Sequence, residues 1–132
     1  MLPQDCLREL NTCWLPNITD AGLDRLIELL EKGSPLLIHG SFSRAMPMGC
    51  LATHIAWHHP ATEQTTVDAG VQWLSRVAGL NPVSSQVIRE WDRAQECNWE
   101  VRQDLLGVFK EHREVRRQQT ESEPRSRVLQ EV

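Results

Sequence analysis

Cys50, His54 and His58 lie four residues apart along one segment of the chain, and all three residue types are ligands for zinc and related transition metals. On a helix, residues at this spacing advance by only about 40° around the axis, so their side chains share one face. His59 directly follows His58 and can complete the set. The spacing therefore predicts a site for zinc or another transition metal at Cys50, His54, His58 and His59.

Other interpretations of these residues stay open. A further ligand in the metal hypothesis would come from Glu63 or from one of the cysteines Cys6, Cys13 and Cys97. Zinc sites usually combine two paired ligand groups, and this segment offers one. In the structural alternative, the first two residues of the set belong to the core, with the imidazole hydrogen-bonded. The two later histidines would then end a helix, where a cation interacts favourably with the last carbonyls.

Cys50 is also a candidate nucleophile, with His54 or His39 as the base and Asp68 or Asp92 orienting that base. A cysteine in the first turn of a helix has its thiol pKa lowered by the helix dipole. However, the histidine and glutamate spacings of zinc hydrolases are absent, and no other catalytic motif surrounds the cysteine. The sequence thus predicts no catalytic residue and a non-enzymatic protein.

Helical periodicity places these residues in an all-α fold, a compact single-domain bundle of about five helices. Residues 46–59 are apolar nearly all round, so we expect them to form a buried central helix. Periodicity and capping residues predict further helices at about 4–12, 20–32, 63–78 and 81–95, and from Asn98 onward. Two inward stripes are expected, one of Val83, Val87, Ile88 and Trp91 and one of Val101, Leu105, Val108 and Val115.

The predicted boundaries depend on a few residues with strong local preferences. Thr19, Asn81 and Asn98 are good N-caps, and Gly33 can take the left-handed conformation that ends a helix. Residues 36–38 are apolar, but no other segment offers a strand to pair with them. We therefore expect an extended, buried connector there.

The 132 residues predict a helical domain over residues 1–119 and a mobile polar C-terminal tail over 120–132, which is rich in Glu, Arg, Ser and Pro. A net charge of −4 provides no basic field, so we expect neither nucleic acid nor a membrane as partner. The chain start lacks a secretory signal, and the four cysteines form no CxxC pair. These features predict free thiols and a cytoplasmic location.

Several of the five tryptophans are expected to pack between helices in the core, but five are more than so small a core requires, and the last helix is long and charged. Buried aromatic side chains often dominate protein interfaces. The sequence therefore predicts a protein that binds another protein or itself, as in a homodimer, with tryptophans such as Trp99 at the interface. No cofactor is expected apart from the metal of the alternative hypothesis.

Three short segments, Gly49–Leu51, Glu90–Asp92 and Asn98–Val101, occur in an order that resembles a group of small, uncharacterised all-α bacterial and phage proteins. In that group, a Gly-rich loop leads into a Cys-Leu helix, a later helix ends in Trp-Asp, and a capped helix follows. The resemblance covers the middle and last thirds of the chain, and the run His54–His59 departs from it. It implies an all-α fold and no particular activity.

Overall fold

A computed structural model of the chain describes residues 2–34, 36–38, 48–62, 68–94 and 99–131, with side chains described up to residue 120 except those of Ala94 and Trp99. The fold is all-α and 72% helical, with no strand among the described residues, which confirms the predicted fold class. The α-helices are α1 (Gln4–Glu9), α2 (Asp20–Lys32), α3 (Leu51–Ala56), α4 (Ala69–Gln72), α5 (Gln86–Ala94) and α6 (Trp99–Glu131).

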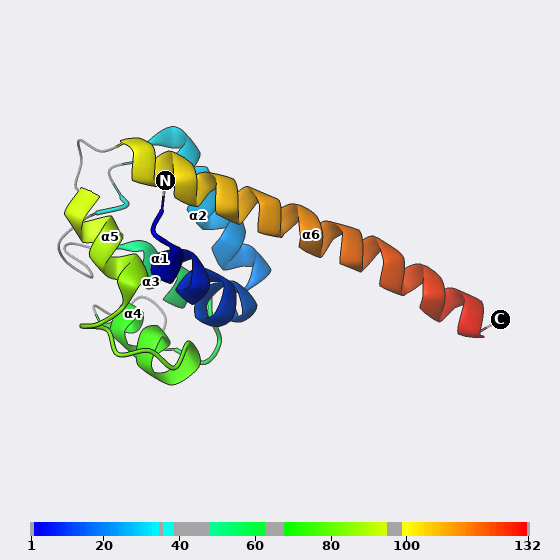
Figure 1. Cartoon of the computed structure of the whole chain (residues 1–132). Coiled ribbons are helices and arrows are strands. Elements are labelled where there is room, and N and C mark those ends of the chain that lie inside the picture. Colours follow the sequence, from blue (N-terminus) through cyan, green and yellow to red (C-terminus); the bar gives the residue numbers. More distant parts are fainter. Residues whose placement is uncertain (1, 35, 39–47, 63–67, 95–98, 132) are drawn as a thin grey trace.

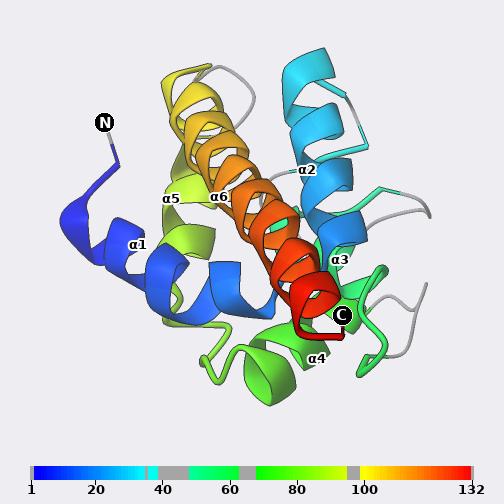
Figure 2. The ribbon, with the colours of Figure 1, turned by 90° about the vertical axis from the view of Figure 1, so that its right-hand side faces the viewer.

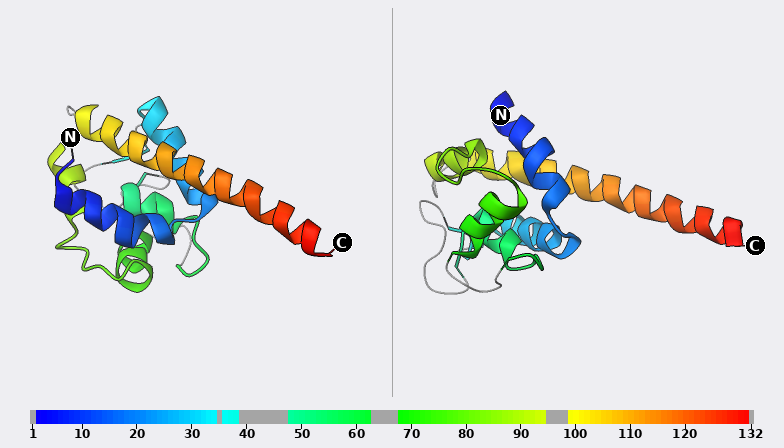
Figure 3. Two further views of the ribbon diagram at one scale, coloured as in Figure 1. Left: turned by 45° about the vertical axis from the view of Figure 1, so that its right-hand side comes forward. Right: turned by 90° about the horizontal axis from the view of Figure 1, so that it is seen from below.

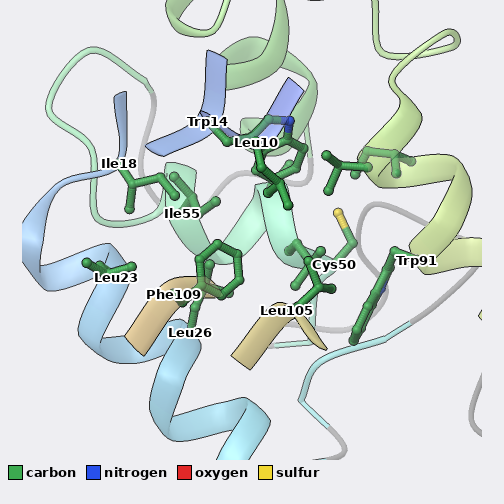
Figure 4. Close-up of a cluster of buried hydrophobic side chains, with 14 of the residues drawn as sticks. Leu10, Trp14, Ile18, Leu23, Leu26, Cys50, Ile55, Trp91, Leu105 and Phe109 are labelled. Atoms are coloured by element: carbon green, nitrogen blue, oxygen red, sulfur yellow. The ribbon is translucent and has the colours of Figure 1, made fainter. Parts of the chain in front are cut away.

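Helix α6 crosses the body with α2 on one side and α1 and α5 on the other, then extends well beyond it (Figures 1 and 2). Helix α3 lies at the centre, as predicted, because all six of its residues are buried. Ile55 of α3 is surrounded by side chains of α2, α6 and the N-terminal segment (Figure 4). Leu26 of α2 and Phe109 of α6 are likewise fully buried, so these helices share one core.

Helix α3 is shorter than the predicted helix 46–59. Gly49 pairs with the apolar connector, because its N–H donates to the Leu36 carbonyl and its carbonyl accepts from the Ile38 N–H, both at 2.9 Å. This bridge holds the backbone extended through Cys50, so the helix begins at Leu51. Leu37 and Ile38 of the connector are buried as predicted, whereas Leu36 is half-buried in a turn, and the connector does have a pairing partner. Residues 46 and 47 lie outside the described residues.

Both predicted boundaries of α2 are confirmed. The Thr19 hydroxyl accepts a 3.1 Å hydrogen bond from the Gly22 N–H and also donates one of 2.9 Å to the His58 carbonyl. The first bond caps the helix, and the second ties its start to the segment after α3. At the other end, Gly33 takes φ 60°, the left-handed conformation that favours glycine.

Two shorter helices differ from their predicted ranges. Helix α1 passes into a π-helical turn over Leu10–Trp14, beyond the predicted end at residue 12. Helix α4 begins at Ala69 rather than near residue 63, since Asp68 lies in a turn and residues 63–67 lie outside the described part. A second π-helical turn, Trp73–Val77, leads to Gly79 at φ 71°, which stops the helix as predicted.

The predicted start of α5 is wrong. Asn81 caps a turn instead of a helix, because its side-chain oxygen accepts from the Val83 N–H at 2.9 Å. Val83 was expected to face inward, yet it is 87% exposed in that turn. Helix α5 begins at Gln86, and the Ser85 hydroxyl accepts a 3.3 Å hydrogen bond from the Ile88 N–H, the pattern of an N-cap.

Helix α6 runs for 33 residues and includes residues 120–131, for which the composition predicts a mobile tail. The backbone there continues the helix away from the body, as two further views show (Figure 3). The predicted stripe is correct at Leu105 but wrong at Val115, which is 44% exposed. Phe109 takes the inner position instead, because it lies on the same face as Leu105, one turn later.

Candidate functional site

Cys50 is a buried thiol at the start of α3. Its side chain is only 2% exposed, and its sulfur lies 3.7 Å from the Thr53 hydroxyl oxygen. Burial raises the pKa of the thiol, and this effect outweighs the hydrogen bonds with Thr53, which lower it. Because metal ligation and nucleophilic attack both need the thiolate, Cys50 in this position is a neutral core residue.

His54 is held in the middle of α3 by a backbone contact. Its Nε2 donates a 2.8 Å hydrogen bond to the Leu36 carbonyl, and its ring meets the Trp57 ring edge-on at 5.0 Å. The residue is 2% exposed, and burial lowers the pKa of the imidazole. The histidine is therefore neutral, and the nitrogen bonded to Leu36 is not available as a metal ligand.

His58 and His59 lie beyond the end of α3, in a tighter turn. Their backbone N–H groups donate to carbonyls three residues earlier, those of Ile55 and Ala56, so the α-helical pattern does not continue through His58. His58 is exposed, whereas the Nδ1 of His59 accepts a 3.0 Å hydrogen bond from the Ala61 N–H. Burial lowers the pKa of His59.

The predicted metal ligands are thus divided between the core and a surface turn. Within the described part of the chain, no group of three or more His, Cys, Asp or Glu residues is placed to hold a metal ion. Of the other proposed ligands, Cys6 is buried, and burial raises its thiol pKa to about 12, while Cys13 is half-buried. Glu63 and Cys97, together with the alternative base His39, lie outside the described residues.

Three tryptophans belong to the core. Trp14, Trp73 and Trp91 are fully buried, and the first two meet edge-on with ring centroids 5.1 Å apart. Trp91 donates to the Ile38 carbonyl at 2.7 Å and carries the Arg102 guanidinium 5.1 Å from its ring centre. The core therefore accounts for these three rings, and an interaction surface must be sought among other residues.

Arg116 anchors α6 to the segment that connects α1 and α2. Its guanidinium donates to the Leu15 and Ile18 carbonyls at 2.6 and 2.7 Å and to the Asp20 carboxylate at 2.9 Å. Its Nε donates to Nε2 of His112 at 2.9 Å. The sequence offered no signal for this role, because the carbonyls that define it come from a segment about a hundred positions away.

Two further ion pairs link α6 to α2, which runs antiparallel to it. Lys110 lies 2.9 Å from Glu31, and Arg113 lies 3.5 Å from Asp24. With the Arg116–Asp20 pair, they join the two helices at successive levels. Pairs as exposed as these stabilise by less than about 1 kcal/mol each, so their main effect is to fix the relative position of the helices.

Three surface grooves open along residues 108–120 of α6, where the helix leaves the body. One is a groove of about 330 Å³ with a mixed apolar and polar lining, here called the α1–α6 groove, and it is lined by Leu7, Asn11, Leu15, Val108, Glu111, His112 and Val115. The other two lie on the side of α2 and include Asp20, Arg116 and Thr120. These three grooves thus surround the part of α6 that leaves the body.

None of the helices among the described residues is both long enough and apolar enough to cross a membrane. No protein-family model, no curated protein and no solved structure matches this chain. The resemblance to small all-α bacterial and phage proteins therefore stays a prediction.

Proposed function

We propose that this chain is a non-enzymatic protein-interaction module in which the helical body holds α6 out to another protein chain. The observation that carries this proposal is the length of α6 relative to the body. Its 33 residues correspond to roughly 50 Å of helix. Among the side chains described, the hydrogen bonds and ion pairs that join α6 to the body extend only to Arg116.

Residues 117–131, called here the projecting segment, are roughly 22 Å of helix beyond that anchor. A helix of this length is only marginally stable alone in water. Pro124 lies in its middle, where the missing N–H and the ring cost about 3 kcal/mol relative to alanine. A bound partner would offset this cost by burying one side of the segment.

The surface around the base of the segment supports the same proposal. Val115 is 44% exposed beside the α1–α6 groove, while Leu7 and Val108 in that groove are half-buried. A partner that covered these three side chains would remove apolar area from water. Arg116 at this level gives the segment a defined direction, which lowers the entropy lost on binding.

A cytoplasmic location belongs to this proposal. Cys6, Cys13 and Cys50 are free thiols, and free thiols persist in reducing compartments. Metal binding by Cys50, His54, His58 and His59 is the alternative function, but the described geometry contains no observation that favours it. It is addressed by the zinc experiment below.

The proposal is tested by photo-crosslinking in cells that produce the full chain. A photoreactive residue at exposed Gln118, at the start of the projecting segment, should crosslink to a protein chain. The matched control is exposed Val83, which lies in the turn before α5 and should give no specific product. Equal crosslinking from both positions, or none from Gln118, would reject the projecting segment as an interaction element.

A further inference from the structure

His112 takes part in the contact that anchors α6 to the segment connecting α1 and α2. The Nε–H of Arg116 donates a 2.9 Å hydrogen bond to Nε2 of this imidazole. A ring nitrogen can accept a hydrogen bond only while it carries no proton. The contact therefore requires a neutral His112 whose single ring proton is on Nδ1, and it is lost when the imidazole gains a second proton on Nε2.

The hydrogen bond to His112 helps to fix the orientation of the Arg116 guanidinium. This group is planar and rigid, so an acceptor at Nε sets the plane in which its other two nitrogens lie. Of these, Nη2 donates to the Leu15 and Ile18 carbonyls at 2.6 and 2.7 Å, and Nη1 donates to the Asp20 carboxylate at 2.9 Å. His112 thus positions the arginine that holds α6 against the N-terminal segment and the start of α2.

The charged groups that face His112 come from α2 and from α6 itself. His112 lines two of the grooves, whose charged lining residues are Asp20, Glu111 and Arg116, and the N-terminal segment contributes only uncharged residues to them. Burial lowers the pKa of His112, and the positive charge of Arg116 lowers it as well, while the negative charge of Asp20 acts in the opposite direction. The contact is therefore complete above the unfolded value near 6.5 and is lost as the pH falls toward the folded value.

We infer that His112 is a proton-sensitive part of this anchor, which orients Arg116 while it is neutral and weakens the hold of Arg116 when it is protonated. Protonation replaces an acceptor by a donor and places two cations side by side, so the hydrogen bond gives way to repulsion. The projecting segment is then held in one direction at neutral pH and less firmly in acid. This regulation goes beyond the proposed function, because it concerns the attachment of α6 whether or not the segment binds a protein.

Nitrogen NMR of the purified full chain measures the protonation of His112 directly. At neutral pH the ring should carry its proton on Nδ1, and in a titration the Arg116 Nε–H signal should change with the same midpoint as the imidazole. Arg116→Gln should raise the pKa of His112, because it removes the neighbouring positive charge. A ring protonated at Nε2 at neutral pH, or a His112 pKa that is the same in Arg116→Gln, overturns the inference.

Amide hydrogen exchange measures how firmly α6 is held beyond the anchor. Protection of the amides of residues 117–120, corrected for the intrinsic effect of pH on exchange, should fall by about tenfold in the wild type between pH 7 and pH 5. His112→Gln retains an acceptor and does not titrate, so its protection should stay high at both pH values. His112→Lys carries the positive charge at both, so its protection should be low at both. The amide of buried Leu26 in α2 is the internal reference for opening of the whole core.

The variants also separate His112 from other titrating groups. If His112→Gln loses protection in acid as the wild type does, another group causes the effect and the inference is wrong. It is equally wrong if His112→Lys is protected like the wild type at pH 7. The matched control is His58→Gln, which replaces an exposed histidine in the turn after α3 and should keep the wild-type response. Crosslinking from Gln118 tests the interaction function on its own, so each proposal can fail without the other.

Discussion

The Glu9 carboxylate accepts a 2.6 Å hydrogen bond from the Ser85 hydroxyl, although the two residues are 76 positions apart in the chain. The same carboxylate accepts from the backbone N–H groups of Gln86 and Val87 at 2.8 and 3.1 Å, and from the Trp14 indole at 2.9 Å. A carboxylate at the end of α1 thus caps α5, where negative charge also interacts favourably with the helix dipole.

We expect Glu9→Gln to lower the free energy of unfolding by about 1.5–3 kcal/mol, because the neutral amide places an NH₂ group against donors. Urea denaturation measures this loss. The control is Glu114→Gln on the exposed face of α6, whose pairing with Arg117 is also exposed, and its effect should stay within about 0.5 kcal/mol. Similar losses for both variants would contradict the capping role of Glu9.

Gly70 and Gly107 provide a matched pair of glycine substitutions within helices. A Cβ at Gly70 would lie 2.6 Å from the Thr53 hydroxyl oxygen and 2.9 Å from the Thr53 backbone nitrogen, whereas a Cβ at Gly107 meets nothing within 4 Å. Gly70→Ala should therefore destabilise by about 1–3 kcal/mol, since the α3 backbone must move. Gly107→Ala should stabilise by about 0.5–1 kcal/mol. Thermal melts measure both changes in stability. If the two substitutions change the stability in the same direction, the close approach of α3 and α4 is wrong.

His54 should make stability depend on pH. Burial lowers the pKa of this imidazole in the folded chain, so the unfolded chain binds its proton first as the pH falls. The stabilisation is complete above the unfolded value near 6.5 and is lost as the pH falls toward the folded value. His54→Leu should remove this dependence, so relative to the wild type it should gain stability between pH 7 and pH 5.

The Leu36 carbonyl keeps a partner in this variant, because it also accepts from the Gly49 N–H at 2.9 Å. His54→Leu should therefore cost less than about 1 kcal/mol at pH 7. His54→Gln, which retains a donor but does not titrate, is the control and should remove the same pH dependence. If the free energy of unfolding of both variants changes with pH as it does in the wild type, His54 does not titrate in this way.

The effect of zinc on thermal stability distinguishes a structural role of Cys50 and His54 from the metal alternative. The Nε2 of His54 is bonded to Leu36 and the Cys50 thiol is buried, so we expect neither zinc nor a chelator to shift the melting temperature. Elemental analysis of the purified chain provides the direct measurement. Stoichiometric metal that is lost in His54→Leu but retained in a His112→Gln control would establish the metal alternative instead.

Local signals predicted the parts of the fold that depend on neighbouring residues. Thr19 and Gly33 bound α2 where expected, because a cap needs only side-chain and backbone groups within one turn. The burial of α3 followed from its apolar composition. In contrast, Asn81 was expected to cap α5, but its side chain closes a turn instead. Helix α5 begins at Gln86, where the Glu9 carboxylate accepts hydrogen bonds from the first backbone N–H groups.

The metal hypothesis depended on one assumption that the sequence could not test, namely that a single helix continues through His58. The start of that segment is held extended by the pairing of Gly49 with residues 36–38, and its end is tied to Thr19 by the His58 carbonyl. Both contacts involve segments distant in sequence. The helix spans six residues, and Cys50 and His54 lie in the core whereas His58 lies exposed in the turn that follows.

By itself, the sequence determined the all-α class and the burial of the central helix, because periodicity and composition are properties of the chain alone. Only the tertiary structure decided three contacts. Glu9 caps α5, the Leu36 carbonyl accepts the hydrogen bond from His54 Nε2, and Arg116 holds α6 against the segment between α1 and α2. Each of these contacts joins groups far apart in the chain. Their energies exist only once the core has brought the segments together, and no local preference of the residues encodes them.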